Sequence, residues 1–153
     1  MKKLAPFFIS CLLLVGAAAC NDASKTAESA PDNVSQNPAS PAAQTTQEAK
    51  QDAQSELRRR QLNQDIRARE QRNNTTGGDA DRATGDLASE VRSKLEANIP
   101  DGQLTVAADQ QGNVTVNGTV NNQDQYNKIQ PLAKEIKGVK NVVNKAVVAK
   151  PQQ

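Results

Sequence analysis

The feature that most constrains the fold is a strand-like stretch at residues 113–120, followed about twenty residues later by a glycine and a second apolar run at 138–144. Within the first stretch Val114, Val116 and Val120 alternate with polar residues, which is typical of a strand with one buried face. Between the two stretches, helical spacing places four apolar side chains on one face, namely Tyr126, Ile129, Ala133 and Ile136. The pattern predicts a strand, then a helix that Lys137 and Gly138 end with a left-handed residue, then a last strand.

Residues 86–108 add a helix and a strand in front of this pattern. Apolar residues recur every four positions from Leu87 to Ile99, Asp86 is a plausible N-cap, and Pro100 disfavours helical geometry at the residue before it. Residues 103–108 alternate again, and a polar turn ending at Gly112 joins them to the 113–120 stretch, so an antiparallel pair is expected. The predicted order is helix, strand, strand, helix, strand.

This order resembles the αββαβ fold of the BON domain, a small module of the bacterial envelope. Gly118 and the pair Gly138 and Val139 fall where the BON motif has its glycines. The resemblance covers residues 86–148 and implies an α+β domain, with a three-stranded mixed sheet and two helices on one face. Gly118 is interpreted as a structural glycine, where a helix approaches closely or the strand bulges, and Gly138 as a structural helix stop.

Two details of this domain stay open at the level of sequence. The last strand has apolar residues on both parities, Val142 and Val148 against Val143 and Val147, so its register is undecided. Pro131 lies inside the second helix, where it removes a backbone hydrogen bond and either kinks or splits the helix.

The N-terminus predicts export. Lys2 and Lys3 precede an almost wholly apolar stretch at 4–15, and three alanines lead to Cys20, which is the layout of a signal peptide spanning residues 1–19. The stretch is too short for a membrane-spanning helix. Small residues before Cys20 resemble the bacterial lipobox, so we expect lipid attachment at Cys20 and a membrane anchor facing the periplasm. Ordinary signal peptidase cleavage at the same bond is the alternative, and Asn21 after the cysteine favours the outer membrane.

The chain between Cys20 and the domain is polar. We expect a disordered tether at 20–46, a partly helical segment at 47–72, a Gly/Asn-rich linker at 73–85 and, after the domain, a tail at 149–153. The 47–72 segment has i,i+4 pairs but too thin an apolar stripe to pack firmly. Its arginines are interpreted as a solvated face, and contact with anionic lipid or a cell-wall polymer is the alternative.

Composition excludes whole classes of chemistry. The chain contains no histidine, which excludes histidine-based catalysis and the usual zinc sites. Cys11 lies in the predicted signal peptide and Cys20 at its end, so no disulfide is expected, and the acidic residues show no paired motif. Tyr126 is the single aromatic residue after the signal peptide, and the remaining charges balance, so nucleic-acid binding is not expected. No catalytic residue, metal or cofactor is predicted.

Lys134, Lys137, Lys140 and Lys145 make the end of the domain locally basic and are the candidate binding residues. The resemblance implies a non-enzymatic envelope lipoprotein that binds phospholipid or other envelope components and supports membrane integrity or stress tolerance. Its expected partners are the membrane, anionic phospholipid or an envelope protein. The alternative function is a tethered protein-interaction module that assists a channel, secretin or cell-wall complex.

Overall fold

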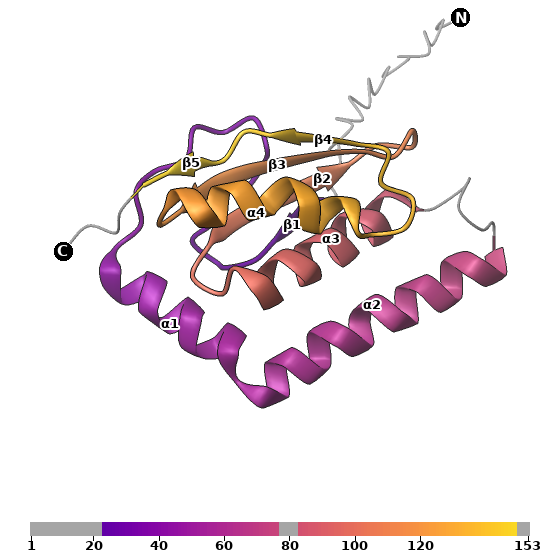
Figure 1. The fold of residues 1–153 in the computed structure, drawn as a ribbon, viewed down its shortest axis with the longest axis horizontal. Coiled ribbons are helices and arrows are strands. Elements are labelled where there is room, and N and C mark those ends of the chain that lie inside the picture. The colour runs from indigo at the N-terminus through magenta and orange to yellow at the C-terminus, as the bar shows by residue number, and fades with distance from the viewer. Residues whose placement is uncertain (1–22, 77–82, 150–153) are drawn as a thin grey trace, which may run out of the picture.

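The computed structural model describes residues 23–76 and 83–149. The predicted signal peptide, Cys20 and most of the predicted tail therefore lie outside the described residues. Figure 1 shows the arrangement of the helices and strands. In chain order they are β1 (Ser24–Lys25), α1 (Ala43–Gln54), α2 (Glu56–Thr76), α3 (Thr84–Asn98), β2 (Gln103–Ala108), β3 (Asn113–Val120), α4 (Gln123–Lys134), β4 (Asn141–Asn144) and β5 (Val147–Val148).

The sheet is mixed and has β3 at its centre. β2 and β3 are antiparallel, with Leu104 opposite Gly118 and Ala108 opposite Val114. β4 and β5 both pair with β3 in parallel, and β1 adds a short antiparallel strand at the outer edge of β2. The predicted α+β fold, with the order helix, strand, strand, helix, strand, is confirmed; β1 is an addition that the sequence did not predict.

One face of the sheet packs against α3 and α4, which lie side by side on it (Figure 1). The hydrophobic core between these layers is drawn wholly from residues 87–146. Its largest members are Leu87, Val91, Leu95, Ile99, Leu104, Val106, Val114, Val116, Val120 and Ile129. These are the positions that the two periodicities predicted.

α3 begins earlier than expected. The residue before its first turn is Ala83, which offers no side-chain cap, so the expectation that Asp86 is the N-cap is wrong. Asp86 instead lies inside the first turn, where its carboxylate faces the positive end of the helix dipole and two arginines. The helix ends as predicted, with Ile99 as its C-cap and Pro100 next.

α4 is a single helix through Pro131, so the proline does not split it. Asn122 caps its start by accepting a hydrogen bond from the Gln125 backbone N–H at 2.9 Å. The Gln125 side chain accepts a hydrogen bond from the Asn121 N–H at 2.8 Å, so Asn122 and Gln125 form a capping box that is shifted by one residue. The helix ends at Lys134, three residues before the predicted stop, and the Glu135 N–H bonds to the Pro131 and Leu132 carbonyls in a tightened last turn.

The register of the last strand explains why both parities carry valine. Val142 pairs with Val114 and is buried against the helices, whereas Val143 pairs with Thr115 on the opposite face and is exposed. β5 keeps the same register, with Val147 opposite Thr119. Because β4 and β5 form the edge of the sheet, valines on its far face meet solvent.

The polar region before the domain differs most from the expectation. Residues 23–42 include β1 and make hydrogen bonds to the sheet, and the segment predicted to be partly helical forms α1 and α2. Ser55, which is extended, separates these helices, and α2 continues to Thr76, into the predicted linker. α2 runs beside α3 (Figure 1). The contacts that hold it there are polar, so the pattern of apolar residues in the sequence did not predict them. Within the described ranges, no helix is long and apolar enough to cross a membrane.

Candidate functional site

The four predicted binding lysines lie in two places in the fold. Lys134 is the last residue of α4, and Lys137 and Lys140 follow in the turn before β4, so three exposed lysines lie within seven residues at one end of the domain. Lys145 lies between β4 and β5, where its N–H donates to Val116 in the middle of β3 at 2.7 Å. Lys134, Lys137 and Lys140 therefore share the segment between the end of α4 and the start of β4, and Lys145 lies farther along the sheet edge.

Two glycines build the turn that carries the lysine cluster. Gly138 has φ +94° and Gly112, in the turn between β2 and β3, has φ +82°. A Cβ on Gly112 would lie 2.5 Å from the Gly138 carbonyl oxygen, and the Gly112 carbonyl accepts a hydrogen bond from the Lys140 N–H at 2.8 Å. The left-handed geometry predicted for Gly138 is confirmed. Gly112, which fixes the lysine turn against the sheet, was not recognised as important from the sequence.

Acidic residues near the lysine cluster are occupied by other partners. Glu135 forms an ion pair with Lys94 of α3 at 2.6 Å. Asp109, in the turn between β2 and β3, accepts hydrogen bonds from the Asn113 side chain and from the backbone N–H groups of Asn113 and Gln111. These bonds, the Asn113 side chain first, lower the pKa of Asp109 below its ordinary value. Glu135 and Asp109 therefore both take part in contacts within the domain.

Gly118 is confirmed as a structural glycine, although the group that approaches it is a strand rather than a helix. Its φ is +127°, and a Cβ built there would lie 2.0 Å from the carbonyl oxygen of Gln103 on β2. On the other side of β3 the ladder is interrupted between β4 and β5, beside the same residue. Gly118 therefore lets β3 pass close to β2 where its parallel partner breaks.

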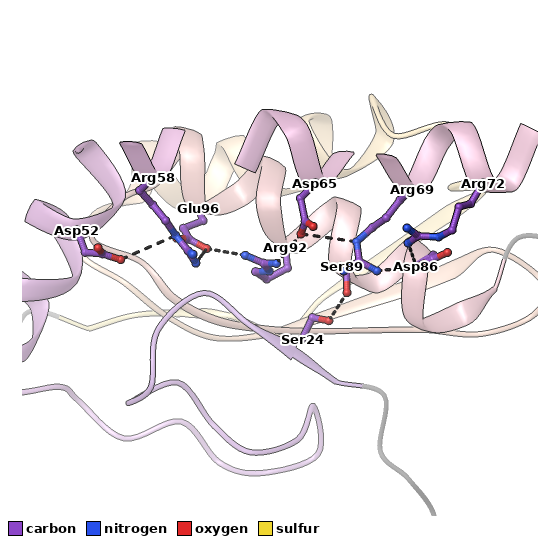
Figure 2. A network of polar contacts seen from close by, with 10 residues as sticks. All are labelled: Ser24, Asp52, Arg58, Asp65, Arg69, Arg72, Asp86, Ser89, Arg92 and Glu96. Atoms are coloured by element: carbon purple, nitrogen blue, oxygen red, sulfur yellow. Dashed lines mark hydrogen bonds and ion pairs between the residues drawn. The ribbon is translucent and has the colours of Figure 1, made fainter. Parts of the chain in front are cut away.

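A second polar cluster lies between α2 and α3, which Figure 2 shows from close by. Arg58 donates two hydrogen bonds to the Glu96 carboxylate, at 2.6 and 3.1 Å, and Arg92 donates one to the same carboxylate at 2.9 Å. Glu96 is 3% exposed, so it is a buried acid between two arginines. The Glu96 hydrogen bond is the main reason that the pKa of Arg58 is raised above its ordinary value.

The same pattern repeats toward the other end of α2. Arg69 and Arg72 both donate to Asp86, at 2.5 and 3.0 Å. Burial acts to raise the pKa of Asp86, but the hydrogen bonds from Arg72 and Arg69 outweigh it and the net pKa is lowered. Asp65 of α2 lies between Arg69 and Arg92 and joins the two groups into one row. Arg58, Arg69 and Arg72 bind acidic residues of α3, which corrects their interpretation as part of a solvated face. Arg59, Arg60 and Arg67 are exposed, as predicted.

The sheet also has a second polar face, which residues 23–42 and Thr46 of α1 cover. Gln103, Thr105, Asn117 and Thr119 are each at most 3% exposed, on the side of the sheet opposite α3 and α4. The strand pattern marked these positions as outward-facing, and nothing in the polar, low-complexity covering segment indicated that it would lie on them. The face is therefore a feature that sequence reasoning missed.

Acidic, cysteine and histidine side chains do not gather into a metal-binding group anywhere in the described ranges. The acids that are buried, Glu90 and Glu96, contact Asn73 and the two arginines respectively. They act as structural partners between helices.

Comparison with known protein families gives a match for the C-terminal domain. The family model of the BON domain matches residues 83–150, which begin one residue before α3 and run past β5. This segment is a BON domain. No curated protein and no solved structure matches the chain. BON domains occur in envelope-associated proteins and are in general non-enzymatic modules that bind phospholipid or other envelope components.

Proposed function

We propose that the protein is a non-enzymatic envelope lipoprotein, anchored through Cys20, whose BON domain contacts anionic phospholipid with Lys134, Lys137 and Lys140. In this role it supports membrane integrity or stress tolerance from the periplasmic side, and the outer membrane is the favoured anchor site. The observation that carries the proposal is the exposed lysine cluster on the turn fixed by Gly112 and Gly138.

The geometry of the turn supports a surface contact. Lys134 at the end of α4 and Lys137 and Lys140 in the following turn are all exposed, and each contributes about 1 kcal/mol near an anionic surface. The nearby acids, Glu135 and Asp109, are held by Lys94 and Asn113. Lys145, which lies apart along the sheet edge, is predicted to contribute less than the other three.

The test uses the chain from Asn21 onward, which keeps every described residue. Flotation with vesicles containing phosphatidylglycerol measures binding of the wild type and of the triple variant Lys134→Gln, Lys137→Gln, Lys140→Gln. A loss of three contacts of about 1 kcal/mol each lowers the association constant on the order of a hundredfold. Binding of the wild type falls as salt is raised, because these charges are exposed and screened.

A matched control removes the same charge elsewhere. Arg59, Arg60 and Arg67 are exposed on α2, so replacing all three by Gln changes the net charge equally and leaves the lysine turn intact. The proposal requires that this control bind vesicles nearly as well as the wild type. If both variants lost vesicle binding equally, net charge would explain the binding, and the lysine cluster would not be a specific contact site. Equal binding by all three proteins would favour the alternative, a tethered module that contacts an envelope protein.

A further inference from the structure

The second face of the sheet combines two properties that rarely occur together, because it is polar and it is buried. Gln103 pairs across the strands with Thr119, and Thr105 with Asn117, which gives a platform of four polar side chains on β2 and β3. Interior faces are usually apolar, and polar side chains are costly to bury without hydrogen bonds. A polar face under a cover is therefore stable both when it is covered and when water replaces the cover.

The cover, residues 23–42, is recognised mostly through its main chain. Thr105 donates its hydroxyl to the Pro31 carbonyl, and Asn117 donates to the carbonyls of Gln36 at 2.6 Å and Asn33 at 3.4 Å. At the edge of the sheet, the Thr26 backbone N–H donates a hydrogen bond of 2.8 Å to the Leu104 carbonyl. Main-chain carbonyls are common to every polypeptide, so the contacts to Pro31, Asn33 and Gln36 do not depend on the side chains at those positions.

The domain does not need the cover to form its core. Every member of the hydrophobic core lies between Leu87 and Ala146. Before residue 83, the described buried apolar residues are Ala30, Ala53 and Leu62, of which Ala30 alone belongs to the cover. Removing the cover would consequently expose polar side chains and leave the apolar core closed.

The edge strand that the cover supplies is also shorter than the strand it protects. β1 has two residues, opposite Val106 and Thr105, whereas β2 has six. Unpaired N–H and C=O groups at a sheet edge accept an added strand from another chain. A strand that matched the whole of β2 would form more ladder hydrogen bonds than β1 does.

We propose that the polar face and the outer edge of β2 form a binding surface for an extended strand of a partner protein, and that residues 23–42 are its exchangeable cover. The favoured occupant is a partner with a longer strand, because a second copy brings the same two-residue strand and gains nothing over the resident one. This surface lies on the side of the sheet opposite α3 and α4, so it is independent of phospholipid binding by the lysine turn.

The test weakens the cover without touching the domain. The Thr26 hydroxyl donates to the Gly102 carbonyl at 2.9 Å and accepts from the Leu104 N–H at 2.8 Å. Thr26→Val removes both bonds and keeps the branched shape. The probes are two fluorescent peptides: residues 23–42 of this chain, and the same peptide with a six-residue alternating valine and threonine strand in place of Ser24 and Lys25. Fluorescence anisotropy measures their binding to the chain from Asn21 onward.

The Thr26→Val chain is expected to bind both peptides about tenfold or more tightly than the wild type does, since two hydrogen bonds no longer hold the competing cover. The longer-strand peptide is expected to bind more tightly than the native one. Adding Asn117→Asp or Thr105→Val to Thr26→Val, which removes a donor from the face, is expected to reverse the gain. Ser35→Ala, in an exposed part of the cover, is the control and leaves binding at the wild-type level.

Hydrogen exchange distinguishes loss of the cover from poor folding of a variant. The β2 amides report on the cover, and the core amides of α3 report on the folding of the domain. Equal peptide binding by Thr26→Val and the wild type, with β2 equally protected, would overturn the proposal. A concentration-dependent dimer that neither peptide dissociates would assign the face to a second copy of the chain. This result would also overturn the proposal.

Discussion

Gly118 is the residue where backbone geometry and packing constrain the sequence most tightly. Its φ of +127° lies in a region that side-chain-bearing residues rarely adopt, and the Gln103 carbonyl occupies the space that a Cβ would need. The sequence marked the position because a glycine interrupted a row of inward valines. The requirement turns out to be close contact between two strand backbones, which makes even a methyl group too large.

Gly118→Ala is therefore expected to lower the free energy of unfolding by about 1 to 3 kcal/mol from backbone strain alone, and by more once β2 is displaced. Urea unfolding of the chain from Asn21 onward measures the change. Gly85→Ala is the matched control, because Gly85 lies in the first turn of α3, where alanine favours the helix by roughly 0.5 to 1 kcal/mol. A Gly118→Ala protein as stable as the control would contradict the close approach of β2 and β3.

At the scale of elements, α2 is held to the domain by charge. Leu62 is buried, but Leu57 is 70% exposed, so the apolar contribution of this helix is small. Glu96 and Asp86 of α3 each accept hydrogen bonds from two arginines. Three of these four arginines belong to α2, and the fourth, Arg92, belongs to α3. A buried acid between two arginines is costly to disturb, because removing it leaves uncompensated charge.

Glu96→Gln is accordingly expected to destabilise the docking of α2 by about 3 kcal/mol. Hydrogen exchange of the α2 amides measures this local opening separately from unfolding of the core. The matched control is Glu135→Gln, which breaks the exposed Lys94 pair and is expected to cost below about 1 kcal/mol. If both substitutions change α2 protection equally, the buried acid does not hold the helix.

The whole molecule consists of a domain with a complete core and a polar N-terminal region wrapped around it. Residues 23–42 cover one face of the sheet, and α2 lies along α3 on the other side of the domain. Because the predicted lipid attachment site, Cys20, precedes the cover by only a few residues, an anchored chain would begin its fold close to the membrane surface. The cover and the anchor are then neighbours in the chain.

Cys20→Ser is expected to move the protein from the detergent-soluble membrane fraction to the soluble periplasm, because acyl chains at this residue provide the stable anchor. Fractionation of cells that express each form makes the measurement, and mass spectrometry of the mature N-terminus identifies the acyl groups directly. Asn21→Gln, which keeps the cysteine, serves as the control. A wild-type protein found soluble and without acyl groups would favour ordinary signal peptidase cleavage.

The sequence by itself determined the domain, because its elements are set by local periodicity and by residues with a single backbone role. The four-residue repeat of α3, the alternation in β2 and β3, the Asn122 cap and Gly138 all fix structure within a few neighbours. Tertiary structure decided the remainder. The edge position exposed Val143, and the polar segment found its place through hydrogen bonds to Thr105, Asn117 and Glu96 that join residues far apart in the chain. Such bonds leave no periodic trace, since a polar residue in a polar segment looks the same whether water or protein satisfies it.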